Sequence, residues 1–467
     1  MMTTINGDID SLNTPIIKSE LHADPIDINT SISLLASAPI SLDIILQKCG
    51  DLGRFQLFHY FFINLISMSA AVVGFYYVFA AANIDHRYGK KWEECVRYLN
   101  GTINDTLVAC PNGWAYDRSV FGYTFTEEAN FVCGSQPKKS WIATLMQCGG
   151  FALLFIGSFA DKFGRKKTIT TVSIILFIIC LITQIMIQWI PMSINIKFIL
   201  LLVNQFASGL TAAAFSLIFI LVLELTSSAH TGFAGNFALV LFTIGEGVVT
   251  LFAYLAKDWQ LLKWINTAFV GLVIPYLYFM PESPLYLYSK RDFFRLEALL
   301  RRIATANKRD EADWYPVYQE LRRNQSFILS NQKELTFLQK AHQILAHRST
   351  VIKLLITALL GFTTLMLYIK IRYGLAAMSI SPYLGILIGA AVEAGGYVTG
   401  SLLISTRLAR KGSFILVTSV TIICVILIPI ISNHSPIATV FIAQFGKFAI
   451  SGSIAVSCNK NRMKIGG

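Results

Sequence analysis

Ten apolar segments of 18 to 28 residues dominate the sequence and constrain its fold more than any other feature. A helix rises about 1.5 Å per residue, so about 20 apolar residues cross a hydrocarbon core about 30 Å thick. Only 14% of the residues are charged, against about a quarter in a soluble domain. We therefore predict an all-α polytopic membrane protein. The spans are 57–82, 141–160, 168–189, 196–223, 237–256, 262–280, 351–371, 384–405, 414–431 and 437–456.

The charges predict which segments face the cytoplasm. The turn 161–167 has four basic residues and one acid, and 406–411 has three basic residues and no acid. Short cytoplasmic loops are rich in Lys and Arg, so both turns, and by parity the amino terminus, are expected inside. The loop 83–140 has seven residues of each sign and is expected outside. The net charge of +12 thus reflects orientation in a lipid bilayer and does not call for a nucleic-acid partner.

The spans divide the chain into two groups. We expect a cytoplasmic amino-terminal segment 1–56, whose first 40 residues lack a hydrophobic period, and then a six-span bundle, 57–280, with the extracellular loop 83–140. A cytoplasmic linker, 281–350, shows helical spacing at 292–304 and 333–346. Four further spans, 351–456, form an incomplete second bundle before a polar tail, 457–467. Two six-span halves would complete a pseudosymmetric transporter.

The turn GSFADKFGRKK at 157–167 is the strongest short motif. Asp161 and Arg165 can pair at a helix end in one conformation and separate in another, while Gly164 permits a tight reversal. We favour a gate over a turn that only sets topology. The turn is similar to the signature between the second and third helices of the major facilitator superfamily.

Other motifs narrow this resemblance to the organic cation and carnitine transporters of that superfamily. They occur in the order expected for those proteins, and the likeness covers residues 41 to about 456. It implies a major facilitator fold and a small organic ion as substrate. The motifs are GDLGRFQ at 50–56, GWAYDRS at 113–119, NFVC at 130–133, PESP at 281–284 and GKF at 446–448.

Ionisable residues inside spans indicate functional positions, since each costs about 2.5 to 3.5 kcal/mol at a helix centre. Glu393 resembles the acid of the family's cation site, and Lys447 its basic residue on the tenth helix. A carboxylate suits a desolvated ammonium substrate, with aromatic faces adding cation–π contacts. The alternative is a structural Glu393–Lys447 ion pair, and the two roles are compatible. Glu246 and Lys370 match no residue associated with the family.

Two further positions are assigned by the resemblance. Tyr373 precedes Gly374 as in the aromatic-glycine motif that lines the family's cavity, although an interfacial anchor is the alternative. Glu224, at the end of the fourth span, matches an acid that pairs with the basic turn at Arg165. The superfamily's fourth-span Arg is replaced by Gln205, which weakens the expected gate network.

The loop 83–140 carries signs of an extracellular environment. Asn100 and Asn104 begin glycosylation acceptor sequences. Two of Cys95, Cys110 and Cys133 could form a disulfide, with a free thiol or an intermolecular bond for the third. Localisation in the plasma membrane is the corresponding expectation.

The end of the chain departs most from the resemblance, because a short polar tail follows where similar proteins continue into two more spans. We expect a transporter of organic cations or zwitterions such as carnitine, working by alternating access. The alternatives are a truncated, non-transporting family member or isoform and an organic anion transporter. The sequence indicates no oligomeric state. No catalytic residues, enzyme activity, cofactor or metal site are expected, since no metal-ligand spacing, serine triad or phosphate-binding loop occurs.

Overall fold

The structure is a computed structural model that describes residues 42–82, 84, 86–87, 97–99, 102–104, 114–329, 345–346, 348–376, 381–404, 406, 408–431 and 435–458. Ten helices in these ranges are long and apolar enough to span a membrane, and the prediction of an all-α polytopic fold is confirmed. The first 41 residues and the tail from 459 onward lie outside the described part.

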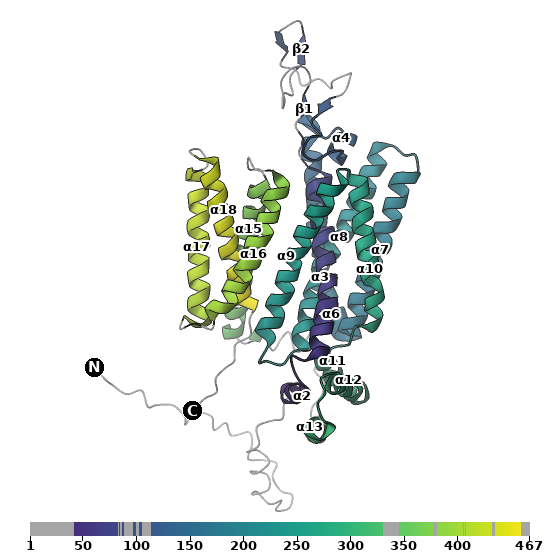
Figure 1. Cartoon of the computed structure of the whole chain (residues 1–467), viewed down its shortest axis with the longest axis vertical. Coiled ribbons are helices and arrows are strands. Elements are labelled where there is room, and N and C mark those ends of the chain that lie inside the picture. The colour runs from purple at the N-terminus through teal and green to yellow at the C-terminus, as the bar shows by residue number, and fades with distance from the viewer. Residues whose placement is uncertain are drawn as a thin grey trace, which may run out of the picture. The chain divides into compact units, whose positions relative to one another are not determined.

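The first bundle is formed by the following helices, shown in purple to teal in Figure 1. They are α3 (Arg54–Ala80), α5 (Ser140–Gly150), α6 (Leu153–Phe163), α7 (Arg165–Trp189), α8 (Ile194–Glu224), α9 (Thr231–Ala256) and α10 (Trp259–Phe279). The second span is two helices, α5 and α6, preceded by the 3₁₀ helix η1 (Cys133–Lys139). The expected single helix over 141–160 is thus interrupted between Gly150 and Leu153.

Glycines set the contact between α5 and α8. An added Cβ on Gly149 would lie 2.0 Å from the Phe206 carbonyl oxygen, and one on Gly209 would lie 2.2 Å from that of Met146. Small residues let two membrane helices approach at backbone distance. This contact therefore depends on both glycines.

The second group of spans contains α15 (Arg348–Ala376), α16 (Pro382–Ile404), α17 (Ala409–Ile431) and α18 (Pro436–Cys458). Helix α16 packs against α18 and also against α9 of the first bundle. Phe79 of α3 stacks on Tyr383 of α16 with ring centroids 5.4 Å apart. The contact between the two groups of helices is therefore made largely by α16.

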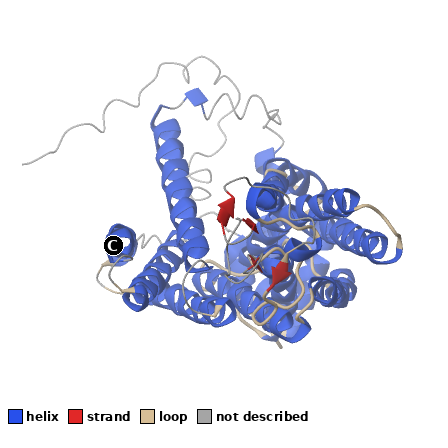
Figure 2. Ribbon diagram, turned by 90° about the horizontal axis from the view of Figure 1, so that it is seen from above, coloured by secondary structure: helices blue, strands red, loops and turns tan. Residues whose placement is uncertain are grey.

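Short elements lie at the two ends of the spanning helices (Figure 1). At one end, β1 (His86–Arg87) pairs antiparallel with β4 (Ala115–Tyr116), and β2 (Arg97–Leu99) with β3 (Thr102–Asn104). Helix α4 (Phe125–Glu128) follows them. Figure 2 shows these strands over the ends of the helices.

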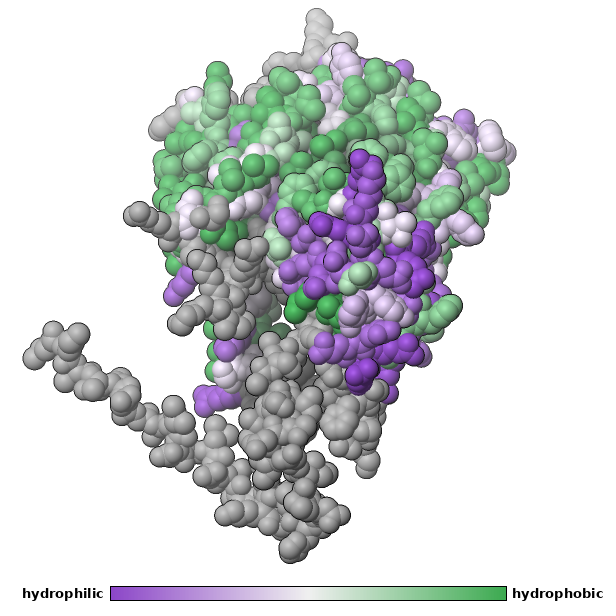
Figure 3. Space-filling model, turned by 60° about the horizontal axis from the view of Figure 1, so that its bottom comes forward, coloured by the Kyte–Doolittle hydropathy of each residue, from purple (hydrophilic) through white to green (hydrophobic). Residues whose placement is uncertain are grey.

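The opposite end carries α2 (Leu42–Lys48), α11 (Pro284–Ser289), α12 (Phe293–Ala306) and α13 (Glu311–Leu329). Asp292 caps α12 by accepting the Arg295 N–H at 3.1 Å. Helix α12 lies where the spacing predicted a helix, whereas α13 was not predicted, and most of the predicted helix 333–346 lies outside the described residues. Figure 3 shows hydrophobic side chains over the spanning helices and hydrophilic ones gathered at this end.

Candidate functional site

Three buried ionisable side chains meet between the two groups of helices. Lys447 of α18 places its Nζ 2.9 Å from Glu393 Oε2 of α16 and 3.6 Å from Glu246 Oε2 of α9. Both carboxylates are 0% exposed and the lysine is 3% exposed. Charges removed from water in this way are stable only when they are paired and hydrogen-bonded.

Two tyrosines complete the cluster. Tyr397 OH donates to Glu393 Oε1 at 2.8 Å, and Tyr368 OH donates to the same oxygen at 2.9 Å. Tyr368 OH also lies 3.5 Å from Glu246 Oε1. The five residues Glu246, Tyr368, Glu393, Tyr397 and Lys447 are called the central cluster below.

Glycines on α16 bring the members of the central cluster together. An added Cβ on Gly396 would lie 2.4 Å from the Phe448 carbonyl oxygen, and one on Gly400 would lie 2.5 Å from that of Gly452. A Cβ on Gly389 would lie 3.1 Å from Lys447 Nζ. Because these positions lack side chains, α16 and α18 approach closely enough for Glu393 to meet Lys447.

Lys447 is shared by two carboxylates. Its ammonium lies 2.9 Å from Glu393 and 3.6 Å from Glu246, so a charged group that enters between the helices would compete for the same atoms. Taking one partner away from a buried ion pair is costly. The pairing within the cluster is therefore sensitive to a charged group nearby.

The sequence identified part of the central cluster. Glu393 and Lys447 were expected near each other, and the structure places them in contact. Glu246 was singled out only as an ionisable residue inside a span. Tyr397 was missed, although its position four residues after Glu393 puts it on the same helical face. Tyr368 has no such signal, because its contact with Glu393 joins two different helices.

The described side chains do not include that of Tyr373. Its backbone belongs to α15, but the expected cavity-lining role of its ring concerns atoms outside the described part, as does the side chain of Lys370. In the loop, Asn100, Cys95 and Cys110 lie outside the described residues. Only the backbone is described for Asn104 and Cys133. Glycosylation and disulfide formation stay predictions.

The expected gate residues do come together at the end of the bundle that carries α11. Arg165 pairs with Asp161, four residues earlier, and places its Nη2 3.4 Å from Glu224 Oε1 of α8. The Asp161 side chain is 71% exposed, whereas those of Arg165 and Glu224 are 15% and 11% exposed. The contact with Glu224 is therefore the more shielded of the two.

The segment PESP holds the same turn through Glu282. Its Oε1 accepts the backbone N–H of Lys166 at 3.0 Å and that of Ser283 at 3.1 Å. Gly164 has φ of +109°, and an added Cβ there would lie 2.4 Å from Glu282 Oε2. Only glycine suits the position between α6 and α7, because the positive φ disfavours other residues and a side chain there would collide with the Glu282 carboxylate.

Asn307, at the end of α12, binds the GDLGRFQ segment. Its Nδ2 donates to the carbonyl oxygens of Cys49 and Gly50 at 3.1 and 2.6 Å, and its Oδ1 accepts the Phe55 N–H at 3.0 Å. The sequence did not indicate this residue. The motif before the first span is therefore held by a side chain from the linker.

A buried lysine in the first bundle was also missed. Lys263 of α10 is 3% exposed and lies 3.4 Å from Thr183 Oγ1. Gln205 of α8, at the position where the resemblance led us to expect an arginine, is 0% exposed. Lys263 lies near the start of α10, where a lysine can be taken for a residue at the membrane surface. The sequence therefore did not single it out as buried.

Comparison with known families decides the membership of the chain. The family model described as Major Facilitator Superfamily matches residues 108–461. The chain belongs to the Major Facilitator Superfamily. Its fold resembles the partially occluded inward-open xylose transporter XylE from E. coli, with a TM-score of 0.55 and 13% identity over 86% of each chain. This family and fold are those of a membrane transporter rather than an enzyme.

Curated relatives agree with the resemblance to organic cation transporters. The chain is 24% identical to organic cation transporter 1 of Caenorhabditis elegans, over 79% of this chain and 67% of the relative. It is 25% identical to mouse solute carrier family 22 member 4, over 57% of this chain and 54% of the relative. Mouse organic anion transporter 3 is 23% identical over 88% of this chain and 79% of its own length. The chain thus spans 67% and 54% of the lengths of the first two of these relatives, and the relatives confirm the predicted family.

Proposed function

We propose that this superfamily member transports organic cations or zwitterions of the carnitine type by alternating access. One observation carries the proposal: two buried carboxylates, Glu246 and Glu393, face the ammonium of Lys447 between the two groups of helices. Carboxylates held away from water suit an organic ammonium substrate, which could take the place of the lysine ammonium. The names of the organic cation transporters among the relatives support the same substrate class.

Glu393 is the carboxylate that we propose binds the substrate. Lys447 and two tyrosine hydroxyls contact its oxygens. An entering ammonium group would compete with Lys447 for this carboxylate, and the tyrosine rings would offer cation–π faces. A zwitterion could bind through both charges, its ammonium at Glu393 and its carboxylate at Lys447.

Alternating access requires contacts that break when the bundles separate. The central cluster has Glu246 on α9 and its other members on α15, α16 and α18. We propose Asp161, Arg165 and Glu224 as a second, gating set, and Tyr373 as part of the cavity wall. The proposed setting is the plasma membrane, with the amino terminus and the α6–α7 turn cytoplasmic and the loop 83–140 outside, where Asn100 and Asn104 would be glycosylated.

Uptake of a quaternary ammonium probe tests the function. The 467-residue chain, reconstituted in liposomes, is expected to take up radiolabelled tetraethylammonium saturably. Glu393→Gln is expected to reduce uptake at least tenfold, while Glu320→Gln, which changes an exposed acid, is the control. Normal uptake by Glu393→Gln would remove this residue from the mechanism, and absence of uptake by the unmodified chain would favour the non-transporting alternative.

Organic anion transport is the second candidate. The relative named organic anion transporter 3 and the buried ammonium of Lys447 favour it. Competition separates the two: excess para-aminohippurate would suppress uptake of the probe only if the site accepts anions.

A further inference from the structure

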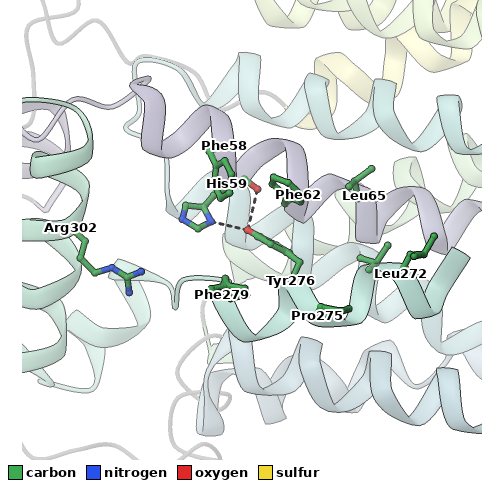
Figure 4. A pocket seen from close by; sticks show the side chains of 10 residues that line it. Phe58, His59, Phe62, Leu65, Leu272, Pro275, Tyr276, Phe279 and Arg302 are labelled. Atoms are coloured by element: carbon green, nitrogen blue, oxygen red, sulfur yellow. Dashed lines mark hydrogen bonds between the residues drawn. The ribbon is translucent and has the colours of Figure 1, made fainter.

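Two adjoining pockets share Arg302 at the end of the bundle that carries α11 and α12. The first, of about 440 Å³, is a groove between α3 and α10. Its lining is mostly aromatic and aliphatic, and Figure 4 shows Arg302 reaching toward it from α12. The second pocket, of about 490 Å³, lies between the α6–α7 turn, α11 and α12.

The groove faces outward. Phe58 is 54% exposed, Leu272 is 78% exposed and Phe279 is 63% exposed, all within the spanning helices α3 and α10. Figure 4 shows the polar groups of the groove, His59 and Tyr276, directed at each other, with His59 Nδ1 2.8 Å from Tyr276 OH. The groove therefore presents mainly apolar side chains toward the bilayer.

The second pocket is basic. It is lined by five basic residues and two acids: Lys166, Lys167, Lys290, Arg295, Arg302, Glu282 and Asp292. Both acids have partners within the pocket. Glu282 accepts the Lys166 and Ser283 N–H groups, and Asp292 caps α12 and pairs with Arg295 at 3.4 Å. Five basic residues still outnumber the two acids. Positive charge is thus in excess.

Arg302 is the residue that joins the pockets. It lines both, and no described carboxylate lies within ion-pair distance of its guanidinium. A guanidinium binds phosphate oxygens with paired hydrogen bonds. Its position between an apolar groove and a basic pocket matches the boundary between acyl chain and headgroup in a phospholipid.

We propose that the two pockets form one binding site for an anionic phospholipid. An acyl chain would lie in the groove against Phe62 and Leu272, and the phosphate would bind Arg302 and the neighbouring lysines. Basic pockets beside membrane helices select anionic headgroups in this way. Bound lipid would fasten α12 to α3 and α10, at a site distinct from the central cluster.

Lipid titration of the purified full chain tests the proposal. Dioleoylphosphatidylglycerol is added to the detergent-solubilised protein, with binding followed by native mass spectrometry and by thermal stability. Dioleoylphosphatidylcholine, with identical chains, tests the headgroup, and glycerol 3-phosphate, without chains, tests the groove. We expect retention and stabilisation with phosphatidylglycerol only. Equal effects of the two lipids, or an equal effect of glycerol 3-phosphate, would overturn the proposal.

Matched variants locate the site. Arg302→Gln is expected to weaken phosphatidylglycerol binding about fivefold, as expected for one basic side chain near an anionic lipid. Arg309→Gln makes the same charge change at an exposed residue near the end of α12 and should leave binding unchanged. Leu272→Trp should weaken binding by filling the groove, whereas Leu154→Trp, at a leucine 71% exposed on α6, should not. Equal affinities in the paired variants would place the lipid elsewhere.

Discussion

The ammonium group of Lys447 lies 2.9 Å from a Glu393 oxygen, and both side chains are buried. The same ammonium is 3.6 Å from Glu246 on α9. One base therefore links acids from the two groups of helices. Replacing Lys447 should therefore lower the stability of the fold as well as change substrate binding.

Removing this base should destabilise the protein. Lys447→Met removes the ammonium that both buried carboxylates face, and breaking a buried ion pair by removing one partner costs about 3 to 5 kcal/mol. Adding Glu246→Gln should restore part of that stability, because one of the two charges is then absent. Denaturant unfolding in detergent measures both effects, with the exposed Lys48→Met as control. A Lys447→Met variant as stable as the control would show that the ion pairs contribute nothing.

Two glycines of α16 should differ in how much an alanine substitution destabilises the protein. In Gly396→Ala the new Cβ would meet the Phe448 carbonyl oxygen at 2.4 Å, so overpacking should cost about 1 to 3 kcal/mol. Gly385→Ala, on the same helix, meets nothing within 4 Å and should be neutral or slightly stabilising. Thermal unfolding compares the two. Equal melting temperatures would contradict the proposed close packing of α16 on α18.

Replacing Arg165 should reduce transport more than replacing one of its basic neighbours. Arg165→Gln removes the contacts with Asp161 and Glu224, worth about 1 to 2 kcal/mol, or about five- to thirtyfold in a conformational equilibrium. Uptake of the ammonium probe should fall accordingly. Lys162→Gln is the control, since among the described side chains the Lys162 ammonium has no carboxylate partner and lies 5.2 Å from the centre of the Phe163 ring. Equal uptake by the two variants would leave Arg165 as a topology signal only.

Asp51 predicts a dependence of stability on pH. Burial raises the pKa of Asp51, but hydrogen bonds from Ser227 and His230 outweigh it and hold the pKa below the usual value. A lowered folded-state pKa stabilises the protein above the unfolded value of about 3.9, and the gain is lost as pH falls through the folded value. Asp51→Asn should therefore be less stable than the unmodified chain at pH 7. In denaturant unfolding the difference should shrink as the pH falls below about 3.9 and vanish below the lowered folded-state pKa, and a difference that persisted under the most acidic conditions would exclude this origin.

The sequence predicted the spans well, because membrane crossing depends on length and hydropathy, which are local properties. It also identified Glu393 and Lys447, since charges inside apolar helices stand out. Tyr368, Lys263 and Asn307 escaped prediction for different reasons. Tyr368 and Asn307 act across elements far apart in the chain, and which side chains meet there depends on helix rotation and tilt. Lys263 resembled a residue near the membrane surface, although it is buried.

The bond between Asn307 Oδ1 and the Phe55 N–H joins residues separated by 252 positions. A ribosome adding about 5 to 20 residues per second would need roughly 13 to 50 s to bridge that interval. Throughout this time the carbonyl groups of Cys49 and Gly50 must bind water or another protein in place of Asn307. The segment that precedes the first membrane helix therefore reaches its final conformation only after the whole first bundle and α12 have been synthesised.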